Sequence, residues 1–274
     1  MGAPSSGKSS LSLNIAFLNS VLSDKRTLYL YLEDMPERYQ FNIFSRYSYH
    51  IGEKIDSNFL KRGISPSDRE AIEKIQAVQD RFLKEKKGEI YYVGMAQLSA
   101  EPNTFAKKLA QIITELKIDI IITDYIQKVK TFKPDTWYSV MDYQNQMASA
   151  LTLLALGQYG NPPCINIMLS QLNREGQKKV GKTNGKMSVF DCAEISTIER
   201  DSMLIIGVHS DQAVRDSGEI GIQILKNRDN MADVTNVPVN FDPKYCMIGD
   251  VEGCDKIPDR DELSAMWENE YGGL

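Results

Sequence analysis

The first residues of the chain combine glycine, lysine and serine in an order that suits phosphate binding. The segment Gly2-Ala-Pro-Ser-Ser-Gly-Lys-Ser9 fits the pattern GxxxxGK[ST] at every fixed position. The glycines let the backbone wrap around phosphates and direct N–H groups at them. Lys8 supplies a positive charge for the β- and γ-phosphates, and the Ser9 hydroxyl is the expected magnesium ligand. The pattern therefore predicts a site for a nucleoside triphosphate with Mg²⁺, formed by Gly2, Ala3, Pro4, Ser5, Ser6, Gly7, Lys8, Ser9 and Ser10.

Two acidic residues follow predicted strands and suit the chemistry of a bound triphosphate. Asp124 ends the apolar strand predicted over 118–123, where a P-loop protein needs a carboxylate to hold magnesium, usually through water. Glu33 ends the strand predicted over 27–32, and its carboxylate can polarise the attacking water. Asp34 is the local alternative to Glu33, and each acid can also be an ordinary turn or loop residue. We favour Asp124 as the magnesium-binding acid and Glu33 as the catalytic base.

Three further polar residues stand at predicted strand ends. Gln171 follows the strand predicted over 164–169, where an amide can sense the γ-phosphate and pass the signal to the next loop. Lys226 and Arg228 end the strand predicted over 219–225 and can reach the nucleotide of a neighbouring subunit as an arginine finger does. The alternatives are a loop amide and ordinary surface charge.

The segment 176–187 is basic and contains no acidic residue. Its cations are Lys178, Lys179, Lys182 and Lys186, and its three glycines predict a mobile loop. Such loops suit contact with the backbone of single-stranded nucleic acid. A solvated surface loop is the alternative interpretation.

These residues must be positioned by elements that alternate along the chain. The sequence predicts helices over 9–22, 37–49, 67–86, 103–116, 139–157 and 191–199. Apolar spacing indicates the first, and capping residues indicate those over 67–86 and 103–116. Strands are predicted over 27–32, 89–93, 118–123, 164–169, 203–208, 219–225 and 237–241. This order favours an α/β fold with a mostly parallel twisted sheet and helices on both faces. In such sheets ligands bind at the carboxyl ends of the strands, where Glu33, Asp124 and Gln171 are expected.

The start of the chain departs from this plan, because a buried strand should precede a P-loop. Only Met1 precedes Gly2. We expect either that the chain is shortened here or that a strand from elsewhere takes the vacant place. The predicted division is an ATPase-type domain over 1–249, lacking this first strand, and an acidic tail over 250–274.

Composition and charge limit the classes of function. The chain has 274 residues and a formal net charge of −5, but eight acids and two bases lie in 250–274. The remaining 29 acids and 30 bases leave a body charge of +1, so any DNA contact must be local or repeated across subunits. The sequence lacks a run of about 18 apolar residues and a signal-peptide pattern, which favours a cytoplasmic protein without membrane contact.

Six motifs together resemble those of a known family. They are Gly2-Ala-Pro-Ser-Ser-Gly-Lys-Ser-Ser, Tyr31-Leu-Glu-Asp-Met35, Ile122-Thr-Asp-Tyr-Ile-Gln127, Leu169-Ser-Gln-Leu-Asn-Arg174, Lys226-Asn-Arg-Asp-Asn230 and Phe241-Asp-Pro-Lys-Tyr245. From Gly2 to about Asp250 the chain resembles the ATPase domain of DnaB-type replicative helicases, a branch of the RecA-like P-loop NTPases. The Lys-Asn-Arg segment also resembles RadA-type recombination ATPases, but the motif from Phe241 to Tyr245 favours the helicases.

The resemblance implies a ring, usually hexameric, with ATP at the subunit junctions and single-stranded DNA held by central loops. It implies that Glu33 is the catalytic base, Asp124 the Walker B acid and Gln171 the sensor. Lys226 and Arg228 would act in trans. The family also has a helical N-terminal domain that contacts primase, so primase or a helicase loader is a candidate partner.

One segment departs from the family pattern. Helicases of this type usually carry Asp-Leu-Arg-Glu-Ser-Gly, a DNA-contacting stretch, where this chain has Asp191-Cys-Ala-Glu-Ile-Ser196. Glu194 is retained as a candidate DNA contact, whereas Ala193 replaces the arginine. The leading hypothesis is an ATP-dependent DNA helicase motor domain acting in replication. The alternatives are a loader, recombination or regulatory ATPase without unwinding activity, and a small-molecule kinase.

Overall fold

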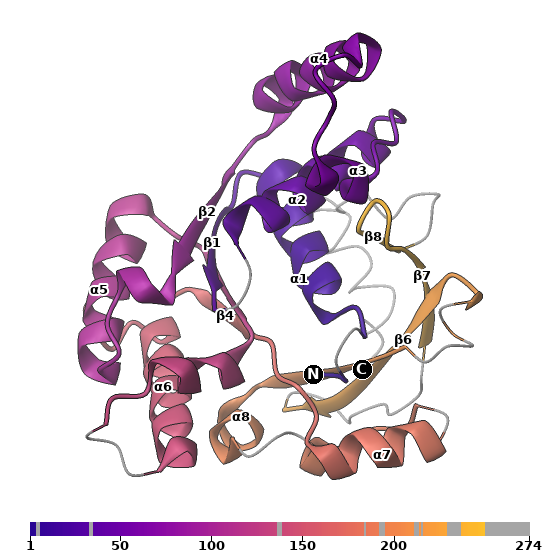
Figure 1. The fold of residues 1–274 in the computed structure, drawn as a ribbon. Coiled ribbons are helices and arrows are strands. Elements are labelled where there is room, and N and C mark those ends of the chain that lie inside the picture. The colour runs from indigo at the N-terminus through magenta and orange to yellow at the C-terminus, as the bar shows by residue number, and fades with distance from the viewer. Residues whose placement is uncertain are drawn as a thin grey trace, which may run out of the picture.

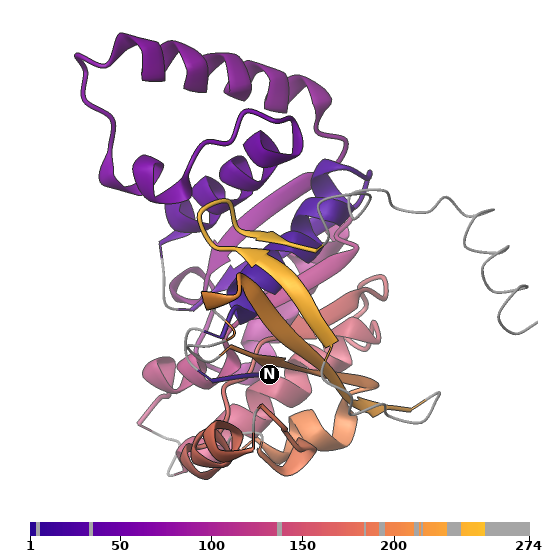
Figure 2. The ribbon, with the colours of Figure 1, turned by 90° about the vertical axis from the view of Figure 1, so that its right-hand side faces the viewer.

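A computed structural model describes residues 1–3, 6–32, 35–135, 139–183, 185–191, 195–210, 214, 216–228 and 237–249, leaving aside the side chains of residues 174, 181 and 182. Figure 1 shows helices on both sides of a central sheet, and Figure 2 shows the same fold from its side. None of the helices in these ranges is long and apolar enough to cross a membrane.

The first half of the chain forms a four-stranded parallel sheet. Its strands, in spatial order, are β2 (Glu89–Gly94), β1 (Arg26–Tyr31), β3 (Ile120–Asp124) and β4 (Ile165–Met168). Side chains alternate between its two faces, as the strand period requires. Leu28 and Ile121 belong to the core on one face, whereas Tyr29 and Ile122 belong to the core on the other. This alternation explains why the central strands are apolar throughout.

Helices cover both faces of the parallel sheet, as Figure 1 shows. On one face α5 (Pro102–Leu116) and α6 (Val140–Ala155) supply the apolar side chains. On the other lie α1 (Lys8–Ala16), its π-helical continuation η1 (Phe17–Val21) and α2 (Pro36–His50). The remaining elements of this half are α3 (Ser57–Arg62), α4 (Arg69–Glu85), η2 (Met95–Gln97) and η3 (Ile126–Phe132).

The second half of the chain forms an antiparallel sheet in the order β5 (Leu204–His209), β6 (Glu219–Asn227), β7 (Val237–Asp242) and β8 (Met247–Ile248). The helices α7 (Arg174–Lys182), η4 (Val189–Asp191) and α8 (Ser196–Asp201) lie between the two sheets in sequence. The β7–β8 hairpin is tied to α1, because Asn14 Nδ2 donates to the Cys246 carbonyl at 2.5 Å. This hairpin therefore lies over the helix that follows the P-loop.

Gly2 joins the two sheets. It forms parallel bridges with Gln171, which follows β4, and with Val208 in β5. Its N–H donates to the Ser170 carbonyl at 3.2 Å, and the N–H of Leu172 donates to the Gly2 carbonyl at 3.1 Å. The place expected for the strand before the P-loop thus lies between β4 and β5, and in the described structure residues 1–3 lie there.

The predicted fold class is confirmed, with a mixed arrangement that the sequence did not indicate: the parallel sheet continues into an antiparallel one.

The predicted mobile loop over 176–187 was wrong for its first half, because residues 174–182 form α7. Asn173 caps this helix by accepting from the Gly176 N–H at 2.6 Å, and Val180 is buried against Leu172. Capping and packing outweigh the cost of helical glycines. The helix expected over 191–199 begins only at Ser196.

Candidate nucleotide-binding site

The P-loop lies between the joined sheets and the start of α1. Gly7 has φ +92°, a left-handed conformation that glycine adopts without strain, and α1 begins at the next residue. Gly2 has no room for a side chain, because an added Cβ would collide with the Val208 carbonyl oxygen. Both fixed glycines of the pattern therefore have a structural reason in this fold. Pro4 and Ser5 lie outside the described residues.

A cavity of about 370 Å³ opens above the loop and is lined by Ser6, Gly7, Lys8, Ser9, Ser10, Phe241 and Pro243. The Ser6 hydroxyl oxygen is buried and has no hydrogen-bond partner among the described residues. A buried polar atom of this kind calls for a partner, and a phosphate oxygen would supply one. The volume, the lysine and the start of a helix all fit the phosphates of a nucleotide.

Lys8 is nearly enclosed by the loop that it serves. Its Nζ donates to the carbonyl oxygens of Gly2, at 2.9 Å, and Ala3, at 2.5 Å. Burial lowers the pKa of Lys8 from 10.5 to about 8, and the negative charge of Asp124 opposes this shift. The two charges thus lie close enough to interact, as a shared phosphate and magnesium site requires.

Asp124 ends β3 and is 4% exposed. Its Oδ2 accepts a hydrogen bond from the Tyr29 hydroxyl at 2.8 Å. Burial, followed by the charge of Asp124, raises the pKa of Tyr29 well above its usual value, so the hydroxyl keeps its proton and can donate. Mg²⁺ prefers oxygen ligands and usually binds only one or two protein groups beside substrate phosphates and water. The Ser9 hydroxyl and the Asp124 carboxylate fit that requirement.

Gln171 lies beside Gly2 because its backbone bridges to the start of the P-loop. Gln127, in η3, holds this backbone. Its Oε1 accepts from the Gln171 N–H at 3.2 Å, and its Nε2 donates to the Ser170 hydroxyl at 2.8 Å. The predicted sensor is therefore brought to the P-loop, as expected for the carboxyl edge of the sheet.

Glu33 lies outside the described residues, as do Asp34 and Glu194. Leu32, which precedes Glu33, donates its N–H to the Asp124 carbonyl at 3.2 Å. The end of β1 therefore reaches Asp124, and the roles predicted for Glu33 and Glu194 remain predictions.

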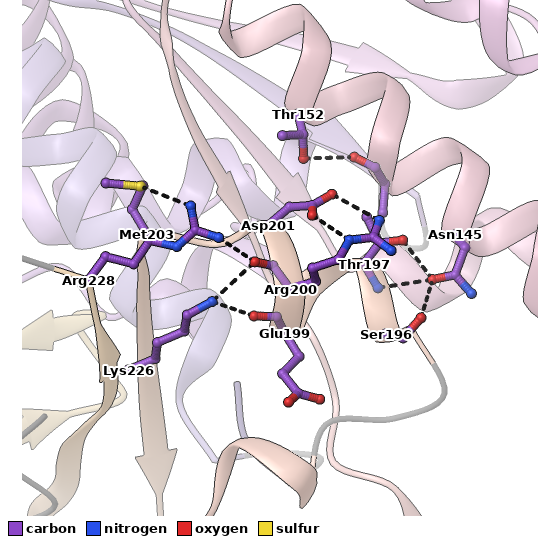
Figure 3. Close-up of polar contacts among 11 residues, drawn as sticks. Asn145, Thr152, Ser196, Thr197, Glu199, Arg200, Asp201, Met203, Lys226 and Arg228 are labelled. Carbon is purple, nitrogen blue, oxygen red and sulfur yellow. Dashed lines mark hydrogen bonds and ion pairs between the residues drawn. The ribbon is translucent and has the colours of Figure 1, made fainter.

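Lys226 and Arg228 are brought together, and both donate to backbone carbonyls near the end of α8 (Figure 3). Lys226 Nζ donates to the Glu199 carbonyl at 2.5 Å and to the Arg200 carbonyl at 3.3 Å. Arg228 Nη2 donates to the Arg200 carbonyl at 2.5 Å. Cations at the carboxyl end of a helix satisfy its last carbonyl groups. The predicted action on a neighbouring subunit stays a prediction.

The lysines of 176–187 differ in their surroundings. Lys178 and Lys186 are exposed. Lys179 forms an ion pair with Asp191, at 3.2 Å between Nζ and Oδ2. The side chain of Lys182 lies outside the description. Among the described side chains, Lys178 and Lys186 are thus the better placed of these residues for a nucleic-acid backbone.

Several site residues were missed from the sequence. Phe241 and Pro243 line the P-loop cavity, although more than 230 positions separate them from Gly7. Their motif was noticed only as part of a resemblance, and no local pattern shows that β7 returns to the P-loop. Tyr29 reads as one more apolar position in a strand, so its contact with Asp124 was equally hidden.

Comparisons with known proteins identify the family and the fold. Residues 1–250 match the family model described as "DnaB-like helicase C terminal domain". The chain is similar to a solved structure described as an "ATPase Domain", with 20% identity and a TM-score of 0.67, over 92% of this chain and 83% of that chain. It is also similar to "The Structure Of A DnaB-Like Replicative Helicase And Its Interactions With Primase", with 18% identity and a TM-score of 0.70. That match covers 92% of this chain and 56% of the other. At these identities the structural likeness shows the fold alone. No curated protein sequence matches the chain.

Proposed function

The chain belongs to the family of DnaB-like helicase C-terminal domains, and on this premise we propose that it is an ATP-driven motor domain that moves along single-stranded DNA in replication. The observation that carries the proposal is the meeting of Lys8, Asp124 and Gln171 at one edge of the sheet. These groups can bind a triphosphate and respond to its γ-phosphate.

Each residue has a part in the proposed reaction. Lys8 and the loop N–H groups bind the phosphates, while Ser9 and Asp124 hold Mg²⁺, which would neutralise charge on the phosphate oxygens. Phe241 and Pro243 add an apolar wall to the cavity that suits a base or ribose. Glu33 acts as the base for the attacking water, and Gln171 reports the state of the γ-phosphate to the segment that follows it.

We propose a homo-oligomeric ring, hexameric in keeping with the family, in which Lys226 and Arg228 act on the neighbour's ATP. Both side chains donate to carbonyls at the end of α8, and neither has a hydrogen bond to a described residue of the P-loop, which supports an action in trans. Lys178, Lys186 and the segment around Glu194 are the proposed contacts to single-stranded DNA. Primase or a helicase loader is the proposed partner; the similar helicase was solved with its primase interactions, and this chain spans only part of that protein.

The test is ATP hydrolysis by the assembled protein at a fixed, stated salt concentration, with and without single-stranded DNA. We expect DNA to stimulate turnover and ATP to drive displacement of a paired strand. A well-folded oligomer whose turnover does not respond to DNA would contradict the motor function.

Ala193 favours a second candidate, a loader, recombination or regulatory ATPase without unwinding activity, because an arginine is replaced at the DNA-contacting stretch. Binding of a labelled oligonucleotide at low salt separates the two, since phosphate contacts weaken steeply with salt. Intact ATP turnover without oligonucleotide binding supports the second candidate.

A further inference from the structure

A path of hydrogen bonds joins the backbone carbonyl of Ser9 to the carboxylate of Asp124, and these two residues are the proposed magnesium ligands. The Ser12 hydroxyl donates to the Ser9 carbonyl at 2.9 Å and lies 3.0 Å from the Tyr29 hydroxyl. Tyr29 in turn donates to Asp124 Oδ2 at 2.8 Å. These hydrogen bonds run from α1 through β1 to β3, so they connect three elements at the edge of the sheet where the P-loop lies.

The residues that form this path are shielded from water. Tyr29 is 0% exposed, Ser12 2% and Asp124 4%. Water therefore does not compete for these hydrogen bonds, and each is stronger than its equivalent on the surface. Removing one partner leaves a buried polar group unsatisfied, which has a larger effect than the loss of an exposed bond.

The direction of the bonds follows from counting protons. Ser12 and Tyr29 have one hydroxyl proton each, and an ionised carboxylate has none. The bond to Asp124 must therefore use the Tyr29 proton, and it is charge-assisted. The Ser12 proton is shared between the Ser9 carbonyl and the Tyr29 oxygen. Tyr29 is thus the residue in this hydrogen-bond path whose donor role, towards Asp124, is fixed.

Strand register and aromatic packing explain why Tyr29 can reach the carboxylate. Tyr29 in β1 lies opposite Ile122 in β3. Ile122 precedes Asp124 by two positions, so the side chains of Ile122 and Asp124 lie on the same face of the sheet as that of Tyr29. Its ring centroid lies 4.6 Å from that of Tyr39 and 6.0 Å from that of Tyr92. The neighbouring rings restrict the side chain, so the hydroxyl is held at one place.

We propose that Tyr29 is a positioning residue, which fixes the orientation of the Asp124 carboxylate and, through Ser12, its separation from Ser9. The proposal rests on the proposed function, because it assumes that Ser9 and Asp124 hold Mg²⁺ with the nucleotide. We call the hydrogen-bonded residues Ser12 and Tyr29 the brace. The brace orients the metal ligands before the nucleotide binds, which reduces the ordering that binding requires. The proposal predicts that removing the Tyr29 hydroxyl lowers nucleotide affinity only when Mg²⁺ is present.

The test uses Tyr29→Phe, which keeps the ring and its packing, and measures equilibrium binding of a fluorescent ATP analogue with Mg²⁺ and with EDTA. We expect affinity with Mg²⁺ to fall about tenfold, as for loss of a charge-assisted bond, and affinity with EDTA to stay unchanged. Ser12→Ala should cause a smaller loss in the same direction, because the bond between Tyr29 and Asp124 remains.

The matched control is Tyr92→Phe, which removes a hydroxyl from the same ring cluster. In the described structure Tyr92 makes no hydrogen bond to Asp124, so this variant should bind as the unmodified protein does. Circular dichroism and thermal melting check each fold; if Tyr29→Phe does not fold, Ser12→Ala carries the test.

The outcomes separate the brace from the proposed function. If the unmodified protein binds the analogue equally with and without Mg²⁺, the proposed magnesium site fails and the brace fails with it. If the unmodified protein needs Mg²⁺ but Tyr29→Phe binds as well as it does, the brace alone is overturned. Equal weakening with Mg²⁺ and with EDTA also overturns the brace, because it indicates a general structural effect.

Discussion

Gln127 clamps the backbone of Gln171: its Oε1 accepts from the Gln171 N–H at 3.2 Å, and its Nε2 donates to the Gln171 carbonyl at 3.3 Å. The same amide nitrogen donates to the Ser170 hydroxyl. Gln127 follows Asp124 by three residues, so the element after β3 fixes the position of the segment after β4. The proposed sensor is therefore positioned by η3, which follows the strand that carries the proposed magnesium ligand.

We expect Gln127→Ala to lower DNA-stimulated ATP turnover about tenfold, because Gln171 loses the two hydrogen bonds that Gln127 makes with its backbone. Unfolding in urea should show a loss of about 2–3 kcal/mol in the free energy of unfolding, typical of the three hydrogen bonds that the Gln127 side chain makes. Gln158→Ala, which replaces an exposed glutamine, is the matched control and should change neither measurement. Unchanged turnover in Gln127→Ala would show that Gln171 does not depend on the clamp.

Lys8→Ala should abolish nucleotide-dependent turnover while the fold is kept. The substitution removes the charge that the cavity offers to the phosphates, and the cavity lies at the surface of an otherwise intact core. Hydrolysis assays with circular dichroism on the same sample give the result. Lys25→Ala, at an exposed lysine paired with Asp119, serves as the control. Retained turnover in Lys8→Ala would remove the basis for the P-loop assignment.

The buried Lys8 should also make stability depend on pH. Its pKa in the folded protein, about 8, is below the value of 10.5 that the unfolded chain has. Between these values the unfolded chain binds more protons, so the free energy of unfolding rises with pH. The charged form of Lys8 therefore destabilises the folded protein below about pH 8, and this destabilisation decreases as the pH rises towards 10.5.

The comparison that isolates Lys8 is between the unmodified protein and Lys8→Met, which keeps an apolar stem. Urea unfolding without nucleotide should show the unmodified protein gaining about 2 kcal/mol relative to Lys8→Met between about pH 7 and about pH 9.5. A difference that stays flat with pH would mean that Lys8 is not desolvated in the folded chain.

Arg228→Ala should reduce turnover in an assembled ring, because the proposed finger is lost. Mixing it with Lys8→Ala subunits should restore part of the activity, since some junctions then combine an intact P-loop with an intact Arg228. No recovery in rings shown to be mixed would contradict an action in trans.

The same substitution removes the bond from Arg228 to the end of α8, so a structural effect must be separated from a catalytic one. Arg200→Ala is the suitable control, because its side chain pairs with Asp201 while its carbonyl still accepts from Arg228. Both variants should unfold at nearly the same urea concentration as the unmodified protein, as expected for exposed contacts. Only Arg228→Ala should lose turnover.

The sequence by itself determined the family and the fold class, and it predicted the phosphate-binding loop and the place of Asp124 at the end of a strand. These features depend on residues close together in the chain: the spacing of glycines and lysine around Gly7, and apolar runs such as 118–123 that end in a polar residue. Local spacing and strand alternation are properties that a single sequence carries, because side-chain period and turn chemistry act over a few residues.

Only the tertiary structure decided which distant residues meet. It brought Phe241 to the P-loop, Tyr29 to Asp124, and Gly2 between two sheets. It also made a helix of a glycine-containing segment whose composition favoured a loop, because Asn173 caps it and Val180 is buried. Such contacts depend on how whole elements pack against each other, and burial and long-range hydrogen bonds can outweigh local preference.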